Sequence, residues 1–179
     1  MCTGNLCRSP MAEGLFRVAL DRRACRDVDV ESSGTWAYVG SPPTSEGVEV
    51  VGRLGGDISM LESRPLDRAQ VDDADVVVAM TSVHLREIAE TAPGSEHKTY
   101  LIKELAEIDP PLQPSGGLAA LAAGRRPPWR RALDLDDPIG LPLAAYERCA
   151  RQISEGVELL ADVLCGAAPT SPDSGPPPS

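Results

Sequence analysis

The stretch CTGNLCRSP, residues 2–10, decides the fold of this 179-residue chain, because a tight turn there leads directly into a helix. Gly4 can adopt the positive φ that such a turn needs, and Pro10 is typical of the first helical position, where an N–H group would have no acceptor. Successive backbone N–H groups of the turn can point inward, and the helix directs the positive end of its dipole at the same place. The stretch therefore predicts an anion site.

Cys2 and Arg8 stand six positions apart across this turn. The planar guanidinium of Arg8 can hold two phosphate oxygens at once, and both the arginine and the helix start favour the nucleophilic thiolate form of Cys2. Asn5 tolerates left-handed backbone angles, and the Ser9 hydroxyl can donate to a thiolate. We therefore interpret the stretch as the phosphate loop of a cysteine-dependent phosphatase.

The other cysteines carry weaker signals. No arginine follows at the sixth position after Cys25, Cys149 or Cys165, so we expect these three to be small buried core residues. Cys7 is either a structural loop residue or the partner of a reversible disulfide with Cys2, which would protect the nucleophile from irreversible oxidation.

The longer string CTGNLCRSPMAE, residues 2–13, resembles the phosphate loop of the low-molecular-weight protein tyrosine phosphatases. The similarity extends over residues 1–165, with SSGT at residues 32–35 and the pair Asp137-Pro138 before the last expected helix. It implies an α/β fold, a three-layer sandwich with a central parallel sheet and the loop at a strand-to-helix junction. It also implies hydrolysis of phosphotyrosine through a phosphocysteine intermediate, with Cys2 as nucleophile, Arg8 binding phosphoryl oxygens and Asp137 as proton donor.

Substrate binding is expected from the loop and from apolar walls that favour a phosphotyrosine ring over a short phosphoserine. The predicted substrate-binding residues are Thr3, Gly4, Asn5, Leu6, Cys7, Arg8, Ser9 and Trp36. Trp36 is equally well explained as a packing residue. Members of the family often carry an aromatic residue after the Asp-Pro pair, and Ile139 and Gly140 replace it here.

The reaction needs a general acid, because a phenolate or alkoxide leaves more readily if it is protonated as the P–O bond breaks. We prefer Asp137, since Pro138 and Gly140 turn the chain directly into the helical pattern near Leu143. Most surface aspartates are only solvated, and three further ones are alternatives by residue type: Asp109, Asp134 and Asp136.

Members of this family begin with a hydrophobic strand that leads into the loop, whereas only Met1 precedes Cys2 here. A central strand of a parallel sheet is buried on both faces, so its loss would remove pairing and apolar contact area. We therefore expect the chain to be unstable as written, and our hypothesis is that translation starts upstream of Met1.

Apolar spacing and turn residues predict alternating helices and strands, and hence a parallel sheet between helices. Helices are predicted at 10–22, after Thr44, at 83–90 and from Leu143 onward. Strands are predicted at 27–31, 75–80 and 99–102. Residues 109–131 contain five prolines and predict a mobile loop with a short helix at 118–123. The basic cluster of that loop either attracts phosphorylated substrate or is simply solvated: Arg125, Arg126, Arg130 and Arg131.

Composition indicates one small domain at residues 1–165 and a disordered Pro/Ser/Gly-rich tail at 166–179. A net charge of −10 argues against nonspecific nucleic-acid binding, and no apolar run is long enough to span a membrane. His84 and His97 lack metal-ligand spacing, so we expect no metal and no cofactor. The odd count of five cysteines favours the cytoplasm, and we expect a monomer that acts on phosphorylated proteins.

Three other functions remain open. Arginine phosphatases of the same family tend to carry threonine at the position of Leu6. Arsenate reductases need resolving cysteines in the middle of the chain, and none lies between Cys25 and Cys149. An inactive phosphate-binding remnant is the alternative from outside the enzymes.

Overall fold

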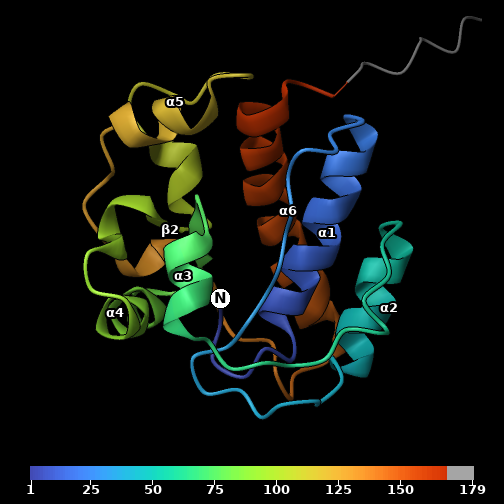
Figure 1. Cartoon of the computed structure of the whole chain (residues 1–179). Helices are drawn as coiled ribbons and strands as arrows, with labels where there is room; N and C mark the ends of the chain where they lie inside the picture. The colour runs from blue at the N-terminus through green and yellow to red at the C-terminus, as the bar shows by residue number, and fades with distance from the viewer. Residues whose placement is uncertain (169–179) are drawn as a thin grey trace, which may run out of the picture.

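Helices and strands alternate along the chain, as the sequence predicts (Figure 1). The computed structural model describes residues 1–168, and the predicted tail lies outside the described residues from position 169 onward. The helices are α1 (Arg8–Arg22), α2 (Ser45–Arg53), α3 (Arg68–Asp73), α4 (Ser82–Thr91), α5 (Gly117–Ala123) and α6 (Leu143–Cys165). The strands are β1 (Val77–Ala79) and β2 (Thr99–Leu101), and short 3-10 helices cover Ser95–Lys98, Glu104–Glu107 and Arg131–Leu133.

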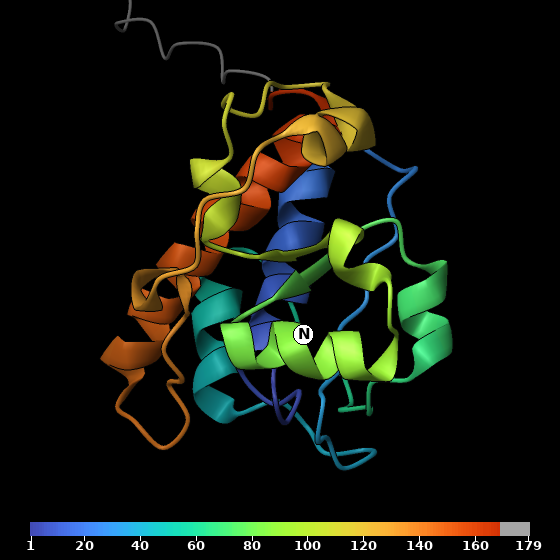
Figure 2. The ribbon, with the colours of Figure 1, turned by 90° about the vertical axis from the view of Figure 1, so that its left-hand side faces the viewer.

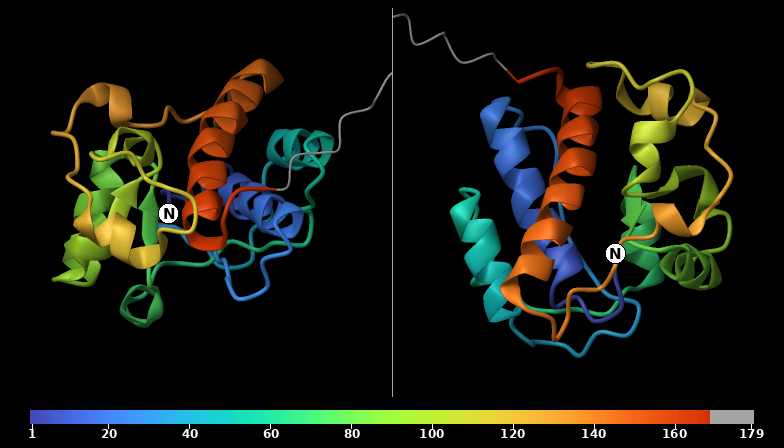
Figure 3. Two further views of the ribbon diagram at one scale, coloured as in Figure 1. Left: turned by 90° about the horizontal axis from the view of Figure 1, so that it is seen from above. Right: turned by 180° about the vertical axis from the view of Figure 1, so that it is seen from behind.

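The two strands form a parallel sheet whose faces enter separate cores. Val77 pairs with Thr99 and Ala79 with Leu101. On one face, Val77 and Leu101 pack in a cluster that includes residues of α3 and α4. Tyr100 belongs to the other cluster, which is built mainly by α1, α2 and α6. Figures 1 and 3 show these two groups of helices on opposite sides of the sheet, so the three-layer α/β fold is confirmed.

Helices α1 and α6 lie side by side over much of their length (Figure 2). On α1, Met11, Leu15 and Ala19 are buried at four-residue spacing, and on α6 Ala150 and Ile153 are buried three residues apart, which places each set on one helix face. Such a stripe removes apolar surface from water at about 25 cal/mol per Å², and this burial holds α1 in place behind the loop. None of the helices in residues 1–168 is both long and apolar enough to cross a membrane.

The strand predicted at residues 27–31 is wrong. These residues have no regular secondary structure, and none of them forms a backbone–backbone hydrogen bond within the described chain. A cavity of about 1230 Å³ lies there, lined by Val28 and Val30, by Val76–Val78, and by side chains of α1 and α6. An extended segment becomes a strand only when a partner accepts and donates its backbone hydrogen bonds, so the local sequence pattern alone was not sufficient.

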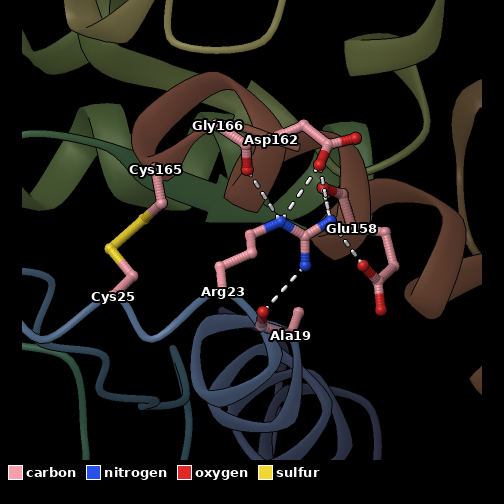
Figure 4. The surroundings of a disulfide bond; sticks show 7 residues. All are labelled: Ala19, Arg23, Cys25, Glu158, Asp162, Cys165 and Gly166. Atoms are coloured by element: carbon pink, nitrogen blue, oxygen red, sulfur yellow. Dashed lines mark hydrogen bonds and ion pairs between the residues drawn. A yellow bond between two sulfur atoms is a disulfide. The ribbon is translucent and has the colours of Figure 1, made fainter. Parts of the chain in front are cut away.

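The prediction for Cys25 and Cys165 is also wrong, because these residues form a disulfide that joins the ends of α1 and α6 (Figure 4). Beside it, the buried guanidinium of Arg23 donates to Asp162 and to the carbonyl oxygens of Ala19 and Gly166. The remaining member of that prediction, Cys149, is a buried free thiol as expected.

Residues 109–131 contain the predicted short helix and contacts that tie the segment to itself and to the core. The expected short helix is present as α5, and Leu121 packs into the core that contains α6. Asp109, the first residue of the segment, and Arg125, which follows α5, form an isolated antiparallel bridge.

Candidate active site

The loop between Met1 and α1 is held through its carbonyl oxygens, whereas its backbone N–H groups of residues 3–7 are unpaired within residues 1–168. Three of its carbonyl oxygens are engaged by neighbouring segments: those of Cys2, Thr3 and Leu6 accept from the backbone N–H groups of Thr35, Trp36 and Thr44, at 2.9, 2.9 and 2.8 Å. In contrast, no backbone N–H of residues 3–7 donates to an acceptor within residues 1–168. Such a set of unpaired donors forms a concave site for an anion.

The left-handed residue of the loop is Asn5, with φ of 53°, whereas Gly4 does not adopt a positive φ, contrary to our expectation. The Asn5 side chain holds this conformation, because Nδ2 donates to Ser9 Oγ and to Ser32 Oγ at 3.0 and 2.9 Å, and Oδ1 accepts from the Arg64 N–H. The glycine that the geometry requires is Gly34, where a Cβ would overlap the Thr3 carbonyl oxygen and lie 2.8 Å from the Asn5 nitrogen.

Cys2 lies at the base of this loop, 1% exposed, and its Sγ is 2.9 Å from Ser9 Oγ. Helix α1 starts at Arg8, so Pro10 is its third residue and not its first. This position also lacks an intrahelical acceptor, which explains why proline is tolerated there. Because α1 begins directly after the loop, the positive end of its dipole faces the loop, and no side chain caps this N-terminus.

Arg8 and Asp137 meet beside the loop. The Arg8 side chain is buried, one terminal nitrogen forms an ion pair with Asp137 Oδ2, and the other donates to the Leu135 carbonyl oxygen at 3.1 Å. Arg8 Nε has no acceptor among the described residues. A buried guanidinium N–H without a partner is costly, so this donor is suited to an anion bound in the loop.

The alternative aspartates lie in other surroundings. Asp134 accepts from the Ser82 backbone N–H at 2.7 Å, at the start of α4. The Asp136 side chain is 88% exposed and pairs with Arg131, and Asp109 pairs with Arg125. Of the four aspartates considered, only Asp137 contacts Arg8.

Cys7 and Cys149 are buried free thiols near the loop. The Cys7 thiol donates to Asp137 Oδ1 at 3.4 Å, and burial together with the Asp137 charge raises the pKa of Cys7. Burial also raises the pKa of Cys149 to about 12. Both therefore remain protonated near neutral pH, and the proposed Cys2–Cys7 disulfide stays a prediction.

The segment that pairs with the loop carries two exposed aromatic side chains, Trp36 and Tyr38. Trp36 is 73% exposed, and its Nε1 donates to Glu87 Oε1 at 3.1 Å. Tyr38 is 85% exposed in the same segment, and Leu6 is half-buried within the loop. Trp36 is therefore not a packed core residue.

The basic cluster of residues 125–131 is neutralised within the chain. Each of its four arginines pairs with a carboxylate, and these partners are Asp109, Glu104, Glu107 and the pair Asp134 and Asp136. An arginine that is already paired with a carboxylate attracts a phosphorylated substrate less strongly. The structure therefore favours the interpretation that these arginines form a solvated surface cluster.

From the sequence, no role in supporting the loop was assigned to Gly34, Arg64 or His84. Arg64 Nε donates to the Ser32 carbonyl oxygen at 2.8 Å, which holds the segment that Asn5 contacts. His84 contacts Thr3 Oγ1. Burial and the charge of Arg8 lower the pKa of His84 to about 4. The sequence did contain a signal for His84. This histidine lies in the first turn of α4, whose N-cap is Thr81, directly after a buried strand.

The residues brought together are a buried thiol, an arginine with a free donor, a carboxylate and a ring of unpaired N–H groups at a helix start. This set defines an α/β protein with an anion-binding loop built for cysteine chemistry. The large cavity beside β1 is a separate feature, because neither Cys2, Arg8 nor Asp137 lines it. No three His, Cys, Asp or Glu side chains in residues 1–168 are arranged to hold a metal ion.

Comparison with known proteins identifies the family. The sequence model of the family described as low molecular weight phosphotyrosine protein phosphatase matches residues 1–110. The chain is 29% identical over 158 residues to the "Probable low molecular weight protein-tyrosine-phosphatase EpsP" of Ralstonia solanacearum. This alignment covers 88% of each chain. It is 36% identical over 104 residues to the protein-arginine-phosphatase of Bacillus subtilis, covering 58% of this chain and 68% of that one.

Among solved structures, the low molecular weight protein tyrosine phosphatase from T. tengcongensis is 32% identical, with a TM-score of 0.71 over 89% of this chain and 92% of that one. The chain belongs to the low molecular weight phosphotyrosine protein phosphatase family, and it is a phosphatase.

Proposed function

We propose that this protein hydrolyses phosphotyrosine on proteins through a phosphocysteine at Cys2. The observation that carries this proposal is the set of unpaired donors around one buried thiol: the N–H groups of residues 3–7 and the Nε of Arg8. A phosphoryl group seated there would place its phosphorus against the sulfur and its oxygens on these donors.

In the first step, the Cys2 thiolate attacks phosphorus, the P–O bond to the tyrosine breaks, and Asp137 gives its proton to the departing oxygen. In the second step, Asp137 takes a proton from a water molecule, which attacks phosphorus and releases phosphate and the Cys2 thiolate. Arg8 and the loop N–H groups stabilise the oxygens of phosphorus in both transition states.

The Arg8–Asp137 ion pair is the state of the site before the substrate binds. A bound phosphoryl group competes with the Asp137 carboxylate for Arg8, because both offer oxygen pairs to the same guanidinium. When the phosphoryl group takes Arg8, the Asp137 carboxylate is released, takes up a proton from solvent, and can then give this proton to the leaving oxygen.

Two features support tyrosine as the substrate. Trp36, whose backbone N–H donates to the Thr3 carbonyl oxygen, and Tyr38, two residues further on, offer exposed aromatic side chains, and Leu6 adds an apolar side chain within the loop. Relatives in this family are named protein-tyrosine-phosphatases. Phosphoarginine is the second candidate, because relatives of 29% and 36% identity are named protein-arginine-phosphatases. The arginine phosphatase YwlE has also been solved as a cysteine-to-serine mutant with a phosphorylated active site serine, at 28% identity and a TM-score of 0.71.

The test compares aryl phosphate and phosphoarginine hydrolysis by the wild type and three variants. Cys2→Ser should abolish turnover yet still bind phosphate, and Asp137→Asn should slow turnover by roughly 10²–10⁴. Asp136→Asn is the matched control, because its exposed side chain does not contact Arg8, and it should keep wild-type turnover. Unchanged hydrolysis by Cys2→Ser would overturn the proposal. Faster turnover of phosphoarginine than of phosphotyrosine would assign the second candidate.

We further propose that the partners are phosphorylated proteins, that the protein acts as a monomer in the cytoplasm, and that it binds neither nucleic acid nor membranes. The net charge of −10 supports the lack of nucleic-acid binding. The need for a reduced Cys2 supports the compartment, whereas the Cys25–Cys165 disulfide is more typical of an oxidising one.

A further inference from the structure

A buried histidine connects the phosphate loop to the neighbouring layer of the fold. His84 lies in the first turn of α4, directly after β1, and is 2% exposed. Its Nδ1 is 3.0 Å from Thr81 Oγ1, and its Nε2 is 3.0 Å from Thr3 Oγ1. Thr3 follows the nucleophilic cysteine, so this chain of three side chains ends next to Cys2.

From these hydrogen-bond partners we assign the ring proton of His84 to Nε2. Thr81 Oγ1 already accepts the backbone N–H of His84 as the N-cap of α4, so its own hydroxyl proton is free to donate to Nδ1. Nδ1 then carries no proton, and Nε2–H donates to Thr3 Oγ1. The low pKa of His84 keeps the ring in this neutral form at pH 7.

The remaining contacts of the loop leave Thr3 as the tie to α4. Asn5 is held by Ser9 and Ser32, and the Leu6 carbonyl oxygen by Thr44, the N-cap of α2, whereas the Thr3 side chain forms a hydrogen bond with His84 of α4. Threonine is stiff at χ1, so fixing Oγ1 also restrains the backbone beside the sulfur.

We propose that His84 is a positioning residue of the phosphate loop: its Nε2–H holds Thr3 Oγ1 and so keeps the backbone N–H groups beside Cys2 aimed at the phosphoryl group. This inference rests on the proposed function. Because Thr3 Oγ1 is the acceptor, the Thr3 hydroxyl proton also stays available for a phosphoryl oxygen. No proton passes between His84 and the substrate.

Two isosteric variants separate positioning from packing. Glutamine can place an amide N–H where Nε2 lies, whereas the shorter asparagine reaches only the position of Nδ1. With aryl phosphate, His84→Asn should lower kcat about tenfold to hundredfold, with KM changed less than about threefold, because a misplaced donor costs most in the transition state. His84→Gln should recover kcat to within about threefold of wild type. The exposed His97 provides the control, and His97→Asn should behave as wild type.

A double-mutant cycle tests the contact itself. In a Thr3→Val background, His84→Asn should lower kcat by less than about twofold, since the acceptor is already absent. The proposal would be overturned if His84→Asn lowered kcat by the same factor in the wild-type and Thr3→Val backgrounds. It would also be overturned if His84→Gln were as slow as His84→Asn while keeping the thermal stability of the wild type.

The proposed function can fail separately. If the wild type hydrolyses no phosphate ester, inorganic phosphate serves as the probe. Its Kd should rise in His84→Asn and be restored in His84→Gln, and the ¹⁵N shifts of the His84 ring should show a protonated Nε2. Equal Kd values in the two variants, or a protonated Nδ1, would overturn the positioning role.

Discussion

Reduction of the Cys25–Cys165 disulfide should destabilise the fold strongly. The bond closes a loop over a sequence separation of 140 residues, between the end of α1 and the end of α6. In the chain-entropy description, opening a loop of that length restores freedom to the unfolded chain worth about 5 kcal/mol at 25 °C. Domains of this size are stable by about 5–15 kcal/mol in total, so the loss would be a large share.

Urea unfolding with and without a phosphine reductant measures this effect. With an m value of about 2 kcal/mol per M, a loss of about 5 kcal/mol moves the midpoint down by roughly 2–3 M. Arg23 still joins α1 to Asp162 of α6 after reduction, so the native fold should persist in the absence of urea.

Cys25→Ser is the matched control, because it lacks the bond under both conditions and its midpoint should not respond to the reductant. A midpoint of the wild type that is the same with and without reductant would refute the reasoning. Free thiols at both positions in an air-oxidised sample, detected by alkylation and peptide mass analysis, would refute it as well.

Two further predictions concern the loop and its support. Gly34→Ala should lower kcat/KM by more than about tenfold, because the new methyl group would displace Thr3 and Asn5, whereas Gly52→Ala on the open side of α2 should leave it unchanged. For His84, the pKa falls from 6.5 to about 4 on folding, so between these pH values the unfolded chain binds a proton that the folded chain does not. Stability should therefore drop by about 3 kcal/mol as pH falls from 6.5 to 4, and His84→Gln should lack this part of the acid sensitivity in urea titrations at several pH values.

The local elements were readable from the sequence because their causes lie within a few residues. The loop and α1 follow from residues 2–10, and α2 begins after Thr44, whose side chain caps it as its position suggests. Helix α3 was missed although its signal was present, since Asp67 and Gln70 form a capping box.

The candidate site was predicted less completely than the fold. Cys2, Arg8 and Asp137 are brought together as expected, although Arg8 and Asp137 are 129 residues apart. The support of the loop was not predicted, because Gly34 and His84 matter only through close approach to a segment distant in sequence.

By itself, the sequence determined the anion loop, the alternation of helices and strands, and the family, because these depend on short-range patterns of backbone and side-chain preference. Only the tertiary structure decided whether residues 27–31 form a strand, which cysteines are bonded, and whether the arginines of residues 125–131 are free. Each of these depends on a partner that the folded chain brings near, and neither sequence spacing nor composition records that distance.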